Sequence, residues 1–63
     1  MKVRELLEQL DYNQIITIQK NCAQTLYKGT VRQCNVIQFG DIEIEKKNIY
    51  TEPDGRLVIR VNG

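Results

Sequence analysis

The sequence predicts an α+β fold in which one N-terminal helix packs on a four-stranded antiparallel sheet of meander order. Two observations carry this prediction. Apolar residues recur at helical spacing near the N-terminus, and the remaining chain alternates apolar and polar residues between turn signals. With 63 residues, we expect a single domain over residues 1–63. A chain of this size has little apolar burial to spare, so each core position matters.

The helix is expected over residues 2–10. Val3, Leu6, Leu7 and Leu10 are spaced i, i+3, i+4 and i+7, which places them on one face. An isolated helix this short does not persist in water, because helix nucleation is unfavourable. Its leucine face must therefore pack on the sheet.

Four strands are predicted after the helix, over residues 14–20, 25–32, 41–50 and 56–62. Between the last two lies Glu52-Pro53-Asp54-Gly55. In such a turn Pro53 restricts φ and Gly55 adopts the left-handed conformation. Residues 33–40 are interpreted as a crossing loop with one helical turn, which brings Phe39 to the edge of the core. The predicted inner residues are Val3, Leu6, Leu7, Leu10, Ile16, Ile18, Tyr27, Val31, Ile42, Ile44, Leu57, Ile59 and Val61.

The alternation breaks near Lys46-Lys47-Asn48. Ile42 and Ile44 occupy even positions, but the next aliphatic residue, Ile49, occupies an odd one. Either a bulge lies there, or Ile49 faces the other way while Tyr50 continues the inner row.

The composition argues against an enzyme. The chain contains no histidine and no serine, so the commonest general base and the usual serine or cysteine nucleophile pairs are missing. Glu43 and Glu45 share one strand face, but paired carboxylates need a cleft to act on a substrate. The chain has no apolar run of membrane-spanning length and no signal-peptide pattern. We therefore expect a cytoplasmic protein with no membrane contact.

Two cysteines, Cys22 and Cys34, are the candidate metal ligands. A structural zinc site needs about four ligands, and the predicted second strand separates these two thiols. We therefore expect two small buried or half-buried thiols and no cofactor. A zinc-stabilised domain and an intermolecular disulfide remain the alternatives.

The outer sheet face is the predicted partner-binding surface. An apolar centre with a polar rim is typical of protein interfaces, whereas scattered aliphatic residues on a solvated face are also common. Either a foreign protein or a second copy in a homodimer would use the same residues. The predicted surface has Leu26 and Val58 at its centre and Lys28, Arg32, Glu43, Glu45 and Arg60 around them.

A nucleic-acid-associated or regulatory module is the second hypothesis. Basic side chains near an aromatic residue are typical of single-strand binders. However, the net charge is only +1, and acidic residues interleave with the basic ones, so direct nucleic-acid contact is the lesser expectation. The candidate residues are Lys28, Arg32, Lys46, Lys47 and Arg60.

Three stretches resemble a diffuse group of very small accessory proteins of Gram-positive phages and mobile elements. They are residues 3–11 (VRELLEQLD), 26–31 (LYKGTV) and 55–61 (GRLVIRV). The resemblance implies a phage-encoded inhibitor of a bacterial defence protein, with an anti-CRISPR protein that binds a type II CRISPR nuclease as the leading instance. It implies no particular functional residues. The chain departs from the group at Cys22 and Cys34, where polar loop residues without thiols are expected.

Overall fold

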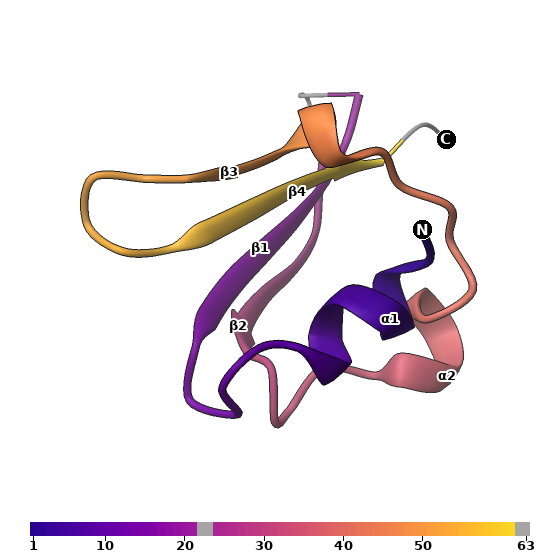
Figure 1. The fold of residues 1–63 in the computed structure, drawn as a ribbon, viewed down its shortest axis with the longest axis horizontal. Coiled ribbons are helices and arrows are strands. Elements are labelled where there is room, and N and C mark those ends of the chain that lie inside the picture. The colour runs from indigo at the N-terminus through magenta and orange to yellow at the C-terminus, as the bar shows by residue number, and fades with distance from the viewer. Residues whose placement is uncertain (22–23, 62–63) are drawn as a thin grey trace.

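The computed structural model describes residues 1–21 and 24–61 as an α+β fold with one four-stranded sheet and two short helices (Figure 1). The helices lie together beside the sheet, and two hairpins supply its strands. In chain order the elements are α1 (Val3–Glu8), β1 (Ile15–Lys20), β2 (Gln24–Thr30), α2 (Val36–Phe39), the 3₁₀ helix η1 (Lys46–Asn48), β3 (Ile49–Thr51) and β4 (Leu57–Val61).

The sheet is mixed, so the prediction of an antiparallel meander is wrong. Its strand order is β2-β1-β4-β3, with antiparallel pairs at both edges and a parallel pair, β1 and β4, in the centre. Ile16 pairs with Leu57, and Ile18 pairs with Ile59. Strands buried on both faces have nearly continuous apolar runs. Residues 15–18 and 57–59 are such runs, which explains why these two strands occupy the centre.

Residues 41–45 do not belong to the sheet, although a strand was predicted over residues 41–50. They lie beside the start of the chain instead. The Val3 amide donates to the Ile42 carbonyl at 3.0 Å, and the Ile44 amide donates to the Met1 carbonyl at 2.8 Å. Ile44 is buried and Glu43 is exposed. In this segment the alternation therefore predicts which side chains are buried, but it does not predict which part of the chain pairs with the segment.

The break in alternation is explained by η1, a 3₁₀ turn rather than a bulge within a strand. It comes immediately before β3 and shifts the facing of the residues that follow. Ile49 packs against the core. Tyr50 is the next residue and pairs with Val58, so it lies on the outer face. The alternative in which Tyr50 continues the inner row is wrong.

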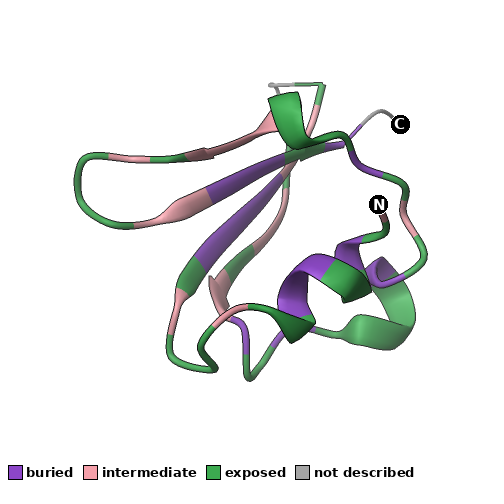
Figure 2. Cartoon of the chain, viewed as in Figure 1, coloured by how far each residue is buried: buried purple, intermediate pink, exposed green. Residues whose placement is uncertain are grey.

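The core lies between the helices and the inner face of the sheet (Figure 2). All thirteen predicted inner residues are buried or half-buried there, and Cys34 and Phe39 join them. Helix α1 is shorter than predicted but presents the expected face, with Val3, Leu6 and Leu7 buried. The side chain of Glu5 accepts the Lys2 amide at 2.8 Å and so satisfies one unpaired donor at the helix start.

Helix α2 is the single helical turn predicted within residues 33–40. The Asn35 side chain begins it by accepting the Gln38 amide at 3.1 Å. Phe39 is buried as predicted, and its ring lies 6.1 Å from that of Tyr27. The turn leaves Ile37 pointing to solvent, with 93% of its surface exposed.

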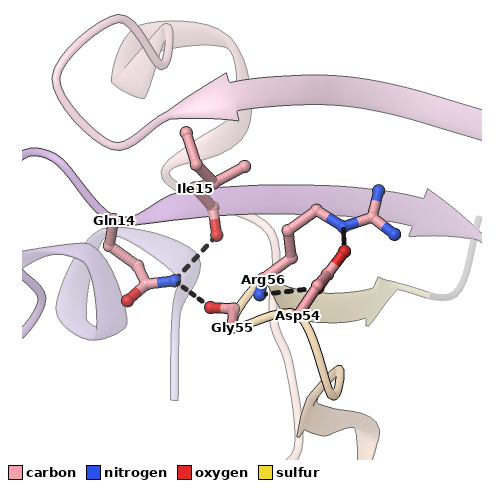
Figure 3. Close-up of polar contacts among 5 residues, drawn as sticks. All are labelled: Gln14, Ile15, Asp54, Gly55 and Arg56. Atoms are coloured by element: carbon pink, nitrogen blue, oxygen red, sulfur yellow. Dashed lines mark hydrogen bonds and ion pairs between the residues drawn. The ribbon is translucent and has the colours of Figure 1, made fainter.

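The turn between β3 and β4 also follows the prediction, with Gly55 at φ 94°. Figure 3 shows how this turn is tied to the start of β1. The Gln14 side-chain amide donates to the Gly55 carbonyl at 2.8 Å and to the Ile15 carbonyl at 2.9 Å. Within the turn, Asp54 accepts the backbone amide and the guanidinium of Arg56. The backbone hydrogen bond from Arg56 is the main cause of the lowered pKa of Asp54.

Replacing Gln14 with Ala is expected to lower the free energy of unfolding by about 1 kcal/mol, because two partly solvated hydrogen bonds are lost. Urea unfolding followed by circular dichroism would measure the change. Gln33→Ala is the matched control, since Gln33 is exposed and should change stability by less than about 0.5 kcal/mol. Equal stability of the two variants would show that the bridge to Gly55 does not hold the hairpin.

Candidate binding groove

A hollow of about 610 Å³ lies between helix α1 and the turns that flank β1 and β2. Its size falls in the range of ordinary ligand-binding clefts. Most of its lining is apolar, with charged groups added from α1 and from the turn after β2. The lining residues are Arg4, Leu7, Glu8, Leu10, Tyr12, Val31, Arg32, Cys34 and Val36. We call this hollow the groove.

Two backbone hydrogen bonds bring the walls of the groove together. The Arg32 amide donates to the Tyr12 carbonyl at 3.0 Å, and the Val31 amide donates to the Gln14 carbonyl at 3.0 Å. They join the turn before β1 to the chain just after β2. The turn before β1 is itself closed by Asp11, which accepts the Asn13 amide at 2.8 Å. Tyr12 and Arg32 are therefore neighbours through backbone pairing, although they are distant in sequence.

The Arg32 guanidinium lies over the Tyr12 ring, 5.6 Å from its centroid. Such a cation–π contact restrains a side chain that would otherwise be mobile. The other arginines are bonded through their guanidinium groups. Arg4 binds Asp41, Arg56 binds Asp54, and Arg60 binds the Tyr50 hydroxyl. Within residues 1–21 and 24–61, no oxygen accepts a hydrogen bond from the Arg32 guanidinium.

Two large apolar side chains of the groove lining are exposed. Tyr12 is 66% exposed and Val36 is 42% exposed; Ile37, the next residue of α2, is 93% exposed. On the sheet, by contrast, Ile15 is the large apolar residue that remains exposed among those described. Exposed apolar groups that cluster beside a concave surface are typical of binding sites.

Cys34 forms part of the groove wall, and burial raises the pKa of its thiol. The same thiol, when charged, adds to the effect of burial that raises the pKa of Tyr27. A raised pKa keeps the thiol protonated, and the thiolate is the reactive form. This environment suits a packing residue rather than a nucleophile.

The raised pKa predicts slow alkylation of Cys34. In a Cys22→Ser background, iodoacetamide at pH 8 should modify Cys34 roughly tenfold more slowly in the folded protein than in urea, because the thiolate is disfavoured and shielded. Mass spectrometry would follow the reaction, and equal rates would contradict the prediction.

The same pKa shift sets the direction of a pH effect on stability. A group with a folded pKa above its unfolded value stabilises fully below the unfolded value, about 8.5 for a thiol. This contribution is lost as pH rises through the higher folded pKa. Stability should therefore decline more steeply in alkaline solution for Cys22→Ser than for Cys22→Ser with Cys34→Ala.

The predicted partner-binding residues do not share one open sheet face. The structure places them in four locations. Lys28, Val58 and Arg60 lie on the outer face, where Lys28 pairs with Thr17 and Thr17 pairs with Val58. Val58 is nevertheless buried, with 4% of its surface exposed, so its apolar surface is not available to a partner.

The remaining predicted residues lie elsewhere. Leu26 falls at the irregularity in the β1–β2 register and packs against the core. Arg32 lies at the groove. Glu43 and Glu45 lie outside the sheet, near Arg60 in a second, more polar hollow. The prediction that these seven residues form one contiguous surface on the outer sheet face is therefore wrong. One reason is that the strand that would have carried both glutamates does not form.

The basic residues considered for nucleic-acid contact are also divided. Lys28 and Arg60 lie on the outer face of two strands separated by β1. Lys46 and Lys47 lie on η1, where Lys47 pairs with Glu45 at 3.2 Å. Arg32 is held at the groove by Tyr12. The structure thus assembles no continuous patch from these five.

The metal hypothesis rests on Cys22 and Cys34. Cys22 lies outside the described residues. Among the described residues, no three histidine, cysteine, aspartate or glutamate side chains lie close enough together to hold a metal ion.

Comparison with protein-family models, curated proteins and solved structures yields no match to this chain. The structure itself therefore supports only a small α+β domain with a groove. Within the described ranges, no helix has the length and apolar character needed to cross a membrane.

The groove was missed at the sequence level because its residues come from separate parts of the chain. Only one signal pointed toward it. Val36 and Ile37 are apolar residues without a clear period, and such residues in a short turn of helix cannot all be buried.

Proposed function

We propose that this chain is a non-enzymatic protein-binding module whose groove receives an apolar side chain from its partner. The observation that carries the proposal is that Tyr12 and Val36, two residues of the groove lining, are exposed apolar side chains, and that the exposed Ile37 follows Val36 in α2. Apolar anchors that enter pockets supply most of the affinity in protein interfaces.

The chemistry of the groove supports binding rather than catalysis. Its titratable groups are two arginines, Glu8, Tyr12 and Cys34. The thiol has a raised pKa, and the chain has no histidine to act as its base. No pair of groups in the groove has the relation of nucleophile and base.

For the partner, we propose a bacterial defence protein, with a type II CRISPR nuclease as the leading instance and inhibition as the outcome. Support for this partner class is the resemblance of residues 3–11, 26–31 and 55–61 to phage accessory proteins. The groove supports protein binding in general and does not discriminate between partners.

The first experiment tests the groove with Ile37→Asp. Because Ile37 is 93% exposed, this change should leave the fold intact while placing a charge on the residue next to Val36 of the groove lining. Gln38→Asp, an exposed neighbour on the same helix, is the matched control. Proteins captured from a bacterial lysate would be identified and purified, and their affinities measured.

A partner at the groove should bind Ile37→Asp at least about tenfold more weakly than the wild-type protein, which corresponds to about 1.4 kcal/mol. The Gln38→Asp control should bind like the wild type. Equal affinity of all three proteins for the purified partner would remove the groove as the binding site.

The partner class has its own experiment. A purified, guide-loaded type II CRISPR nuclease would be assayed for cleavage of target DNA with increasing amounts of the chain. Stoichiometric inhibition by wild type and weaker inhibition by Ile37→Asp are expected. Unchanged cleavage would overturn this nuclease as the partner.

A second candidate function is contact with nucleic acid through the outer sheet face. The observation in its favour is that Lys28 and Arg60 lie on this face, whereas the described strands contain no acidic residue. If this face binds phosphates, affinity for single-stranded DNA should fall steeply with salt and weaken in Lys28→Gln. Binding that is absent at low salt would exclude it.

A further inference from the structure

We infer that the partner segment carries a carboxylate beside its apolar anchor, and that Arg32 binds this carboxylate. The inference rests on the proposed function of the groove and specifies the chemistry of its occupant. It is carried by the state of the Arg32 guanidinium, which lines the groove, lies on Tyr12 and has no acceptor among the described residues.

Arg32 is prepared for an anion by its surroundings. Its backbone amide is fixed by the Tyr12 carbonyl, and its guanidinium lies over the Tyr12 ring. A stacked guanidinium still presents its donors at its edge, in a fork that matches a carboxylate. Less side-chain freedom is lost on binding when the group is already held in place.

The other charged groups of the groove decide where the carboxylate lies. Arg4 already binds Asp41, so its charge is largely offset. Glu8 lines the wall formed by α1 and would repel a second carboxylate. The acidic group of the partner must therefore lie on the Arg32 side, with the apolar anchor between it and the helix.

The apolar lining of the groove determines the second feature of the partner segment, its apolar side chain. Leu7, Leu10, Val31 and Val36 line it, and such a surface favours an aliphatic or aromatic side chain. A leucine followed by an aspartate in an accessible segment meets both conditions. Charge complementarity with Arg32 distinguishes this occupant from a purely apolar one.

The test uses two synthetic peptides, acetyl-Ala-Leu-Asp-Ala-amide and its Asn analogue, acetyl-Ala-Leu-Asn-Ala-amide. They differ by one charge and have no charged termini. Each would be titrated into ¹⁵N-labelled protein at millimolar concentration, and the amide signals of Leu7, Val31 and Val36 would be followed. The Asp peptide should bind roughly tenfold more tightly, because a charged acceptor strengthens the hydrogen bonds from arginine.

Variants assign the effect to Arg32. Arg32→Gln should abolish the preference for the Asp peptide, so that both peptides bind with about equal affinity. Lys28→Gln, which removes a charge on the sheet, should leave the preference unchanged. Arg32→Lys should retain part of it, since lysine keeps the charge but not the fork. The amide spectrum of each free variant would show that the fold is preserved.

Three results would overturn the inference. They are equal binding of both peptides, the absence of shifts at the groove with either peptide, and groove signals that move with protein concentration alone, which would place a second copy there. These results remain distinct from failure of the proposed function. If Ile37→Asp weakens binding of the purified partner but Arg32→Gln does not, the proposed binding site stands. Only the inferred carboxylate of the partner is then excluded.

Discussion

Replacing Ile18 with Ala is expected to lower the free energy of unfolding by about 3–4 kcal/mol, within the range for truncation of a fully buried isoleucine. Ile18 has no exposed surface. It lies in a central strand, where it pairs with Tyr27 on one side and Ile59 on the other. The variant leaves a cavity that neither neighbouring strand can close without losing its register.

This loss is large relative to the total stability of the domain. Domains of this length have a total stability of roughly 3–9 kcal/mol, so Ile18→Ala should be partly or wholly unfolded at 37 °C. Urea and thermal unfolding followed by circular dichroism would measure it. Ile37→Ala is the matched control, because the same atoms are removed from a side chain that is 93% exposed. A loss below about 1 kcal/mol for Ile18→Ala would contradict the described core.

Replacing Gly40 with Ala has the second-largest expected effect, a loss of about 2–3 kcal/mol, the range for forcing an extra group into a packed site. A Cβ atom there would lie 2.3 Å from the Val36 carbonyl oxygen and 2.9 Å from Val36 Cγ1. The backbone must shift to relieve this clash. Gly40 also accepts the Arg4 amide at 3.1 Å, so the shift would loosen the start of α1.

Gly55→Ala provides the comparison for Gly40→Ala. At Gly55 no atom lies within 4 Å of a Cβ, and the loss should be only about 1 kcal/mol, from the left-handed backbone at φ 94°. Equilibrium unfolding in urea would rank the two variants. If Gly55→Ala were the more destabilised, the close packing of Gly40 against α2 would be refuted.

The residues that face the core were predictable from the sequence because the facing of a side chain depends on local periodicity. The helical spacing of Val3, Leu6 and Leu7 places them on the buried face of α1. The alternation of Ile42 and Ile44 with glutamates holds even though these residues are outside the sheet. The turn at Gly55 was predictable for the same reason, since its conformation is set by residues adjacent in the chain.

The strand order was not predicted, although a signal for it was present. A meander would place β4 at an edge, but Leu57, Val58 and Ile59 form an apolar run that suits a strand covered on both faces. Ile15 to Ile18 form a similar run. Two such strands favour a central parallel pair, whereas the short chain length made successive hairpins the simpler prediction.

The candidate site, too, was predictable from the sequence only in part. From the sequence alone came the absence of an acid–base pair such as serine–histidine or cysteine–histidine, and the expectation that apolar residues at the surface mediate binding. Their location came from the tertiary structure. Leu26 and Val58, the predicted centre of the site, are half-buried and buried, whereas Tyr12 and Ile37 are exposed.

The sequence by itself determined the helix face, the thirteen core residues and the turn at Gly55, because each follows from neighbours a few positions away. Only the tertiary structure decided that β1 lies parallel to β4, that residues 42–44 lie beside the N-terminal residues, and that Arg32 stacks on Tyr12 at the groove. These features depend on which distant segments meet. Which segments meet is determined by the combined burial of all the apolar surfaces, and local periodicity contains no information about it.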